Sequence, residues 1–149
     1  MTLPKPQQPP WTLRCLDPGN DLDLVVASWL TVLEHREPYS ALGPHHINRL
    51  YKPLVRELAT PISTIVACDP EDPSELAGYL CGDQAGRVLH WVSVKPAYKR
   101  LGIGSLLMGA YFGDLGEEKI RCTFWTKAAR HRSKDWGLIS DSAPLRKKV

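Results

Sequence analysis

The chain has 149 residues, of which 43% are hydrophobic and 23% are charged, and its formal net charge is +3. These proportions are typical of a globular domain, and a chain of this length buries enough apolar surface to fold without disulfides or metals. A membrane-spanning protein is excluded by the pattern, because no apolar run reaches the roughly 20 residues that cross a bilayer. The N-terminus lacks the apolar segment of a signal peptide, so we expect a cytoplasmic protein without membrane contact.

The first half of the chain predicts one short strand followed by two helices. Residues 11–16 alternate in polarity, which is typical of a strand, and a turn cluster separates them from residues 22–36. Apolar residues recur at 22, 25, 26, 29, 30 and 33, a spacing that places them on one face of a helix. A loop at 37–44 leads to a second helix at 45–59, which we expect Pro53 to interrupt.

The second half predicts mostly strands. Three strands are expected at 62–68, 76–81 and 87–94, separated by an acidic turn at 69–74 and a glycine-containing turn at 82–86. A helix at 103–113, a strand at 120–125 and a short helix at 127–136 follow. The predicted order is therefore β-α-α-β-β-β-α-β, with a short helix after the last strand.

The cysteines are spread along the chain, and no two of them are spaced as C-x-x-C. They are Cys15, Cys68, Cys81 and Cys122. Each lies inside or beside a predicted strand, where a free thiol behaves as a small apolar side chain. We expect reduced core thiols, and we expect no metal site built from cysteine and histidine.

The most informative stretch is 88–108, VLHWVSVKPAYKRLGIGSLLM. Its apolar and β-branched beginning predicts a strand that ends at Pro96. Gly102 and Gly104 then open directly into a helix, whose first N–H groups and dipole favour an anion. Lys99 and Arg100 stand beside this turn and can add charge-assisted contacts to phosphate. The stretch therefore predicts a site for a pyrophosphate.

The spacing of these residues distinguishes the site from two other phosphate-binding motifs. Lys99-x-x-Gly102-x-Gly104 is neither G-x-x-x-x-G-K-[ST] nor G-x-G-x-x-G, so it predicts neither a P-loop nor a dinucleotide fingerprint. It resembles the acetyl-CoA motif [Q/R]-x-x-G-x-[G/A] of the GNAT superfamily of N-acetyltransferases, which follows a strand ending in V-x-P, here residues 94–96. The departure is Lys99, where the family usually has Gln or Arg. It affects one side-chain contact and leaves the backbone of the turn intact.

This resemblance implies a fold. GNAT proteins have an α+β, three-layer fold in which helices flank a mixed, mostly antiparallel sheet, and the predicted element order agrees with theirs. We accordingly expect residues 1–10 to form a proline-rich flexible arm, residues 11–136 a GNAT-like domain and residues 137–149 a basic tail. The closing strands of the family are expected to be truncated or missing. This compact, C-terminally short outline also resembles phage-type members.

The resemblance further implies which residues bind acetyl-CoA or another acyl-CoA. Backbone groups on the strand before the turn would bind the pantetheine arm and the thioester, and the turn would bind the pyrophosphate. The residues at the matching positions are Trp91, Val92, Ser93, Val94, Lys99, Arg100, Leu101, Gly102, Ile103, Gly104 and Ser105.

His90 is the candidate catalytic base on the same strand. The period of two in a strand places His90, Val92 and Val94 on one face. Some family members carry a catalytic histidine or glutamate on this strand, close to the thioester. An unperturbed imidazole has a pKa near 6.5, which suits a group that takes a proton near neutral pH. The alternative is a core histidine that is hydrogen-bonded across the sheet.

A polar cluster opens the second helix, in the region that walls the acceptor pocket in this family. Its residues are His45, His46, Asn48 and Arg49. The resemblance implies that they contact the acceptor substrate. Helix capping or simple surface exposure is the alternative.

The function implied by the resemblance is transfer of an acyl group from CoA directly to an amine acceptor of unknown identity. Two alternatives stay open. No tyrosine follows Tyr111 to protonate the leaving thiolate, which would suit a catalytically degenerate CoA-binding module. Seven Lys or Arg against two acids from Thr126 to Val149 would suit either a solvated tail or nucleic-acid contact, as in a nucleobase-modifying GNAT-like protein.

Overall fold

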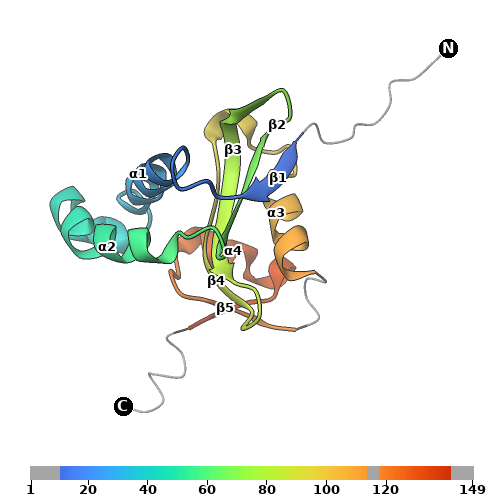
Figure 1. Ribbon diagram of the computed structural model, residues 1–149. Coiled ribbons are helices and arrows are strands. Elements are labelled where there is room, and N and C mark those ends of the chain that lie inside the picture. The colour runs from blue at the N-terminus through green and yellow to red at the C-terminus, as the bar shows by residue number, and fades with distance from the viewer. Residues whose placement is uncertain (1–10, 114–117, 142–149) are drawn as a thin grey trace.

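The computed structural model describes residues 11–113 and 118–141, which form one six-stranded sheet with helices on both faces (Figure 1). The strands lie in chain order and are β1 (Thr12–Cys15), β2 (Thr64–Asp69), β3 (Asp72–Asp83), β4 (Val88–Val94), β5 (Ile120–Cys122) and β6 (Leu138–Ser140). The first four pair antiparallel, whereas β4 with β5 and β5 with β6 pair parallel. The predicted α+β fold with a mixed, mostly antiparallel sheet is confirmed.

Two pairs of helices enclose the sheet and make three layers (Figure 1). On one face lie α1 (Leu22–Leu33) and α2 (Pro44–Leu58), and on the other lie α3 (Ile103–Phe112) and α4 (Lys127–Trp136). Short 3-10 turns, η1 (Tyr39–Leu42) and η2 (Pro96–Tyr98), precede α2 and α3. Each face has its own core, because alternate residues of every strand point to opposite sides of the sheet.

An aromatic cluster lies in the core under α1 and α2. Trp29 of α1 stacks on Trp91 of β4 with ring centroids 5.6 Å apart, and Phe124 packs against Trp29 at 5.5 Å. The opposite core, under α3 and α4, packs Tyr111 and Phe112 beside fully buried aliphatic side chains such as Leu80 and Leu107. Burying such side chains is the main favourable term in folding.

Several predicted elements differ from the structure. Helix α1 ends at Leu33, three residues before its expected end. Helix α2 continues through Pro53, because one proline removes a single backbone hydrogen bond and buried side chains hold the helix on both sides of it. Strand β3 begins at Asp72, because Pro70 and Glu71 alone make the turn that was expected to span 69–74. Strand β5 ends at Cys122, three residues early, where the chain leaves the sheet.

The domain extends beyond the boundary expected at residue 136. Gly137 ends α4 in the left-handed conformation, and the chain then adds β6 beside β5, with Leu138 buried. One closing strand is therefore present, where the sequence predicted that closing strands are truncated or missing. The predicted flexible arm (1–10) and most of the predicted basic tail (137–149) lie outside the described residues.

The cysteines lie in strands, as predicted: one each in β1, β2, β3 and β5. All are free, and only Cys15 is exposed. Within the described residues, no helix combines the length and apolar character needed to cross a membrane.

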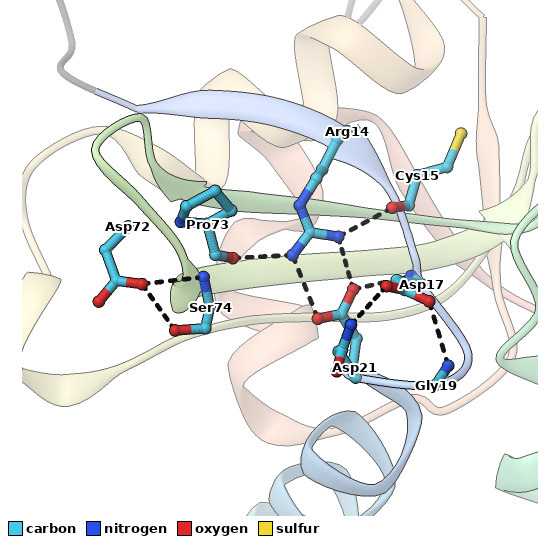
Figure 2. Close-up of polar contacts among 9 residues, drawn as sticks. Arg14, Cys15, Asp17, Gly19, Asp21, Asp72, Pro73 and Ser74 are labelled. Atoms are coloured by element: carbon cyan, nitrogen blue, oxygen red, sulfur yellow. Dashed lines mark hydrogen bonds and ion pairs between the residues drawn. The ribbon is translucent and has the colours of Figure 1, made fainter.

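A partly buried ion pair fixes β1 to the start of α1 and to the beginning of β3 (Figure 2). The guanidinium of Arg14 donates to both carboxylate oxygens of Asp21, at 2.6 and 3.1 Å, and to the carbonyl of Pro73 at 2.8 Å. The Asp21 side chain is 1% exposed. Burial alone would raise its pKa, but hydrogen bonds from Arg14 and from the amide of Asp17 outweigh that effect and lower the pKa of Asp21 below its ordinary value.

Replacing this carboxylate should destabilise the fold. We expect Asp21→Asn to lower the free energy of unfolding at pH 7 by about 1–3 kcal/mol, since hydrogen bonds to charged groups are lost. Because folding lowers the pKa of Asp21, its contribution is present above the unfolded value near 3.9 and is lost as pH falls through the folded value. Chemical denaturation at pH 7 and at pH 3 measures both effects. The control is Asp23→Asn, whose 87% exposed carboxylate pairs with Arg56 and should contribute less than about 1 kcal/mol. Equal losses for the two variants would contradict the prediction.

Candidate active site

The sheet opens between β4 and β5. The two strands pair only at Val88 with Arg121 and at Leu89 with Cys122, and the last bond between them runs from the Thr123 N–H to the Leu89 carbonyl at 3.0 Å. Strand β4 continues to Val94, but the chain after β5 turns away into α4. A gap therefore separates the second half of β4 from any neighbour on that side within the described residues.

The backbone of β4 faces this gap at alternate residues. The Lys95 N–H donates to the Ala77 carbonyl on β3 at 2.8 Å. In an antiparallel pair every second residue faces the partner, so Ser93 also directs its backbone groups to β3. Val92 and Val94 then direct their backbone N–H and C=O groups into the gap, on the side where β5 no longer pairs with β4. These are the backbone groups available to an extended ligand arm.

The turn after β4 presents the start of α3. Gly102 precedes the helix in the left-handed conformation, with φ at +81°, and no side chain caps the helix. The first bond of α3 runs from the Leu106 N–H to the Gly102 carbonyl at 2.9 Å. The N–H groups of Ile103, Gly104 and Ser105 therefore have no partner within the helix, and they form the positive end of its dipole.

The gap and the turn belong to one cavity of about 700 Å³, a volume typical of ligand sites. It passes between the two faces of the sheet, because its walls come from α1 on one face and from α3 and α4 on the other. Most residues predicted to bind the cofactor line it: Trp91, Val92, Ser93, Val94, Lys99, Arg100, Gly102, Ile103, Gly104 and Ser105. The exception is Leu101, which does not line the cavity and is 59% exposed.

The wall opposite β4 is a mostly polar stripe on α1 and the turn that follows it. It comprises Ser28, Thr31, Val32, His35 and Arg36. This stripe was not predicted from the sequence, because the apolar periodicity of the helix marks only its buried face. The signal was present, because positions 28, 31, 32 and 35 follow the i, i+3, i+4, i+7 spacing of a single helix face.

His35 has a defined tautomer in this wall. Its Nδ1 lies 2.9 Å from the carbonyl oxygen of Thr31. A carbonyl can only accept, so Nδ1 carries the hydrogen of the neutral ring and Nε2 is left as an acceptor. His35 is exposed and lines the cavity, so Nε2 can take a proton from a group bound there.

His90 lies outside the lining of the cavity. The register between β3 and β4 shifts by one residue, so that Trp91 pairs with Cys81, Leu89 pairs with Gly82, and His90 has no partner on β3. This bulge breaks the alternation on which the expected common face of His90, Val92 and Val94 depended. The Nδ1 atom of His90 lies 2.8 Å from the hydroxyl of Thr123.

The ring of His90 is partly buried, and burial lowers its pKa. The negative charges of Asp83 and Asp141 act in the opposite direction without cancelling that effect. The neutral imidazole is therefore favoured at neutral pH.

The polar cluster at the start of α2 also lies outside the cavity lining. None of His45, His46, Asn48 and Arg49 belongs to its walls. Asn48 instead donates to the Pro44 carbonyl at 3.0 Å and to the Glu34 carboxylate at 3.3 Å. The structure does not bring this cluster together with the β4–α3 residues.

The one cysteine in the described lining is Cys122, and it is not a nucleophile at neutral pH. Burial raises its pKa to about 12, with a smaller opposing effect of the Phe124 backbone. The thiolate is therefore absent near neutral pH, and covalent acyl transfer through this sulfur is not supported. Among the described residues, no three of His, Cys, Asp and Glu come together as metal ligands.

Residues 29–136 match the family described as "Acetyltransferase (GNAT) family". No match was found among curated proteins. Among solved structures, the apo form of YjaB from Escherichia coli is similar with a TM-score of 0.51 and 17% identity, over 68% of this chain and 63% of that one. Ard1 from Thermoplasma volcanium gives 0.43 and 20%, over 68% and 61%, and an acetyltransferase from Trypanosoma brucei gives 0.36 and 20%, over 93% and 89%. The chain thus spans about three fifths of the first two structures.

Proposed function

Because the chain belongs to the GNAT acetyltransferase family, we propose that it is an acyl-CoA-dependent N-acyltransferase, most simply an N-acetyltransferase, acting on an amine. The observation that carries the proposal is the continuity between the gap beside β4 and the uncapped start of α3. The gap offers the backbone groups of a strand edge to an amide-containing arm. The start of α3 offers free N–H groups to a diphosphate.

The residues present fit an acyl-CoA. The amides of residues 103–105 would hold the diphosphate, and Lys99 and Arg100 would add positive charge beside it. The backbone of Val92 and Val94 would bind the pantetheine arm, which the gap admits into the sheet. When bound, acetyl-CoA supplies the acyl group as a thioester. Leu89, Trp136 and Leu138 give the gap apolar walls that limit access of water.

The chain must also accept a proton, because an amine attacks only when it is neutral. We propose that His35 does this through Nε2, since its Nδ1 is held by Thr31 and its ring lines the cavity. His90, the catalytic base predicted from the sequence, is hydrogen-bonded to Thr123 and does not line the cavity. Direct transfer without an acyl-enzyme agrees with the un-ionised thiol of Cys122.

Titration with acetyl-CoA tests the proposal. We expect saturable heat of binding and, at 100 times the dissociation constant, a stabilisation of about 2.7 kcal/mol in thermal unfolding. Release of free thiol in the presence of a panel of amines then tests transfer. No binding at millimolar acetyl-CoA would contradict the proposal, and tight binding without transfer to any amine would favour a CoA-binding module.

Nucleic-acid contact stays a prediction. Of the seven Lys or Arg that motivate it, four lie on α4 and the other three, at 146–148, lie outside the described residues.

A further inference from the structure

The described walls of the cavity carry positive charge without negative charge. Six lining residues are Lys, Arg or His, and none is Asp or Glu. A polycationic acceptor entering this cavity would lose hydration and meet no carboxylate. The lining therefore disfavours polyamine-like acceptors and favours acceptors that bring a negative charge.

Three of the cationic lining residues that have no carboxylate partner in the described part of the chain sit at two ends of the cavity. Lys99 and Arg100 lie beside the start of α3, where the diphosphate would bind. Arg36 lies at the other end, because the Lys127 N–H at the start of α4 donates to the carbonyl of the adjacent Glu37 at 3.1 Å. The far end of α4 reaches α3, since a Cβ atom placed on Gly104 would lie 3.6 Å from Trp136. The ten residues of α4 separate the two ends by about 14 Å at 1.5 Å per residue.

Arg36 has no carboxylate partner among the described residues. Two other cationic residues of the lining do have a carboxylate partner. Lys95 lies 3.4 Å from Glu75, and Arg132 lies 3.7 Å from Asp135. The ion pairs of the described residues do not include Arg36. The nearby Glu34 instead accepts from Asn48. The Arg36 guanidinium is thus a partly exposed cation whose fork geometry suits a carboxylate.

We infer that the acceptor is an amine that also bears a carboxylate, and that Arg36 binds this carboxylate while His35 faces the amine. The inference rests on the proposed acyl-CoA-dependent function. Val32, Trp91 and Phe124 line the cavity between α1 and β4, so the rest of the acceptor, apart from its two polar groups, is apolar or aromatic. Arg36 and His35 are adjacent in the chain, which requires the amine and the carboxylate to lie within one small molecule or one chain terminus.

Matched acceptor pairs test this inference. The probes are 4-aminobenzoate against 4-aminobenzamide and phenylalanine against phenylalaninamide, with spermidine as the cationic probe. Binding to the CoA-loaded protein is measured by calorimetry, and acetylation is measured by thiol release. We expect each carboxylate to bind at least 10-fold more tightly than its amide. Arg36→Gln should weaken carboxylate binding about 10- to 100-fold and leave amide binding unchanged, and Arg36→Lys should restore part of the loss.

Arg56→Gln is the matched control, because this arginine lies on α2 in an exposed ion pair with Asp23. It should leave both kinds of binding unchanged. The inference is overturned if amides bind as well as carboxylates, if spermidine binds best, if Arg36→Gln weakens both members of a pair equally, or if no probe binds. Acetyl-CoA binding is measured separately. Its absence would overturn the proposed function itself, whereas intact acetyl-CoA binding without carboxylate preference would overturn only the role of Arg36.

Discussion

His35→Gln should slow acyl transfer by about 10²- to 10⁴-fold while acetyl-CoA binding is unchanged. The reason is that Gln cannot take the amine proton, and loss of a general base costs this much in rate. Nε2 of His35 is the acceptor nitrogen of the ring because Nδ1 donates to Thr31. Steady-state rates measured across pH, with calorimetry of acetyl-CoA, separate the chemical step from binding. The variant should also lose the part of the pH–rate profile that reports protonation of the base.

Two further variants make this prediction specific. Imidazole added to His35→Ala should restore part of the rate, which a purely structural role of the ring would not allow. His90→Gln should keep most of the rate, because His90 contacts Thr123 outside the cavity lining. A large loss in His90→Gln together with a normal rate in His35→Gln would return the role of base to His90.

Gly102→Ala should weaken acetyl-CoA binding about 10- to 100-fold, the loss expected for charge-assisted hydrogen bonds. Gly102 has φ at +81°, and an L-residue there costs roughly 1–2 kcal/mol. A Cβ atom at this position meets no other atom within 4 Å, so the change introduces no clash. Its effect comes from the turn relaxing away from the geometry that aims three N–H groups at one anion. Calorimetry with acetyl-CoA measures the loss.

Gly109→Ala is the matched control in the same helix. Its Cβ atom also meets nothing within 4 Å, but Gly109 lies in the middle of α3 without a positive φ. Alanine should raise the stability of this helix by about 0.5–1 kcal/mol and leave acetyl-CoA binding unchanged. Equal binding by Gly102→Ala and the wild type would show that the turn does not hold the ligand.

The site could be predicted from the sequence wherever local chemistry dictates the backbone. Pro96 fixes its own φ and cannot continue the ladder, and Gly102 permits the positive φ that the turn requires. A strand, a turn and a helix start were therefore expected within a residue or two of β4 and α3. The prediction that Pro53 interrupts the second helix was wrong, because packing of α2 overrides the local preference of proline. The acidic turn was predicted too long, because Pro70 and Glu71 alone reverse the chain.

The remaining parts depend on tertiary contacts. The bulge at His90 is invisible in a run of apolar residues, since the extra residue shows only against the register of β3. The stripe that includes His35 and Arg36 becomes a wall only because α1 packs opposite β4. Strand β6 has three residues, too few for a periodic signal, and it is defined by its pairing with β5.

Amide resonances followed during an acetyl-CoA titration test most directly whether one ligand occupies both the turn and the gap. If it does, the N–H signals of Ile103, Gly104 and Ser105 shift together with those of Val92 and Val94, along one binding curve, while those of α2 stay in place. If these five signals stay unmoved at millimolar acetyl-CoA, the ligand binds elsewhere or not at all, and the assignment of this chain as an acyl-CoA-dependent enzyme would fail.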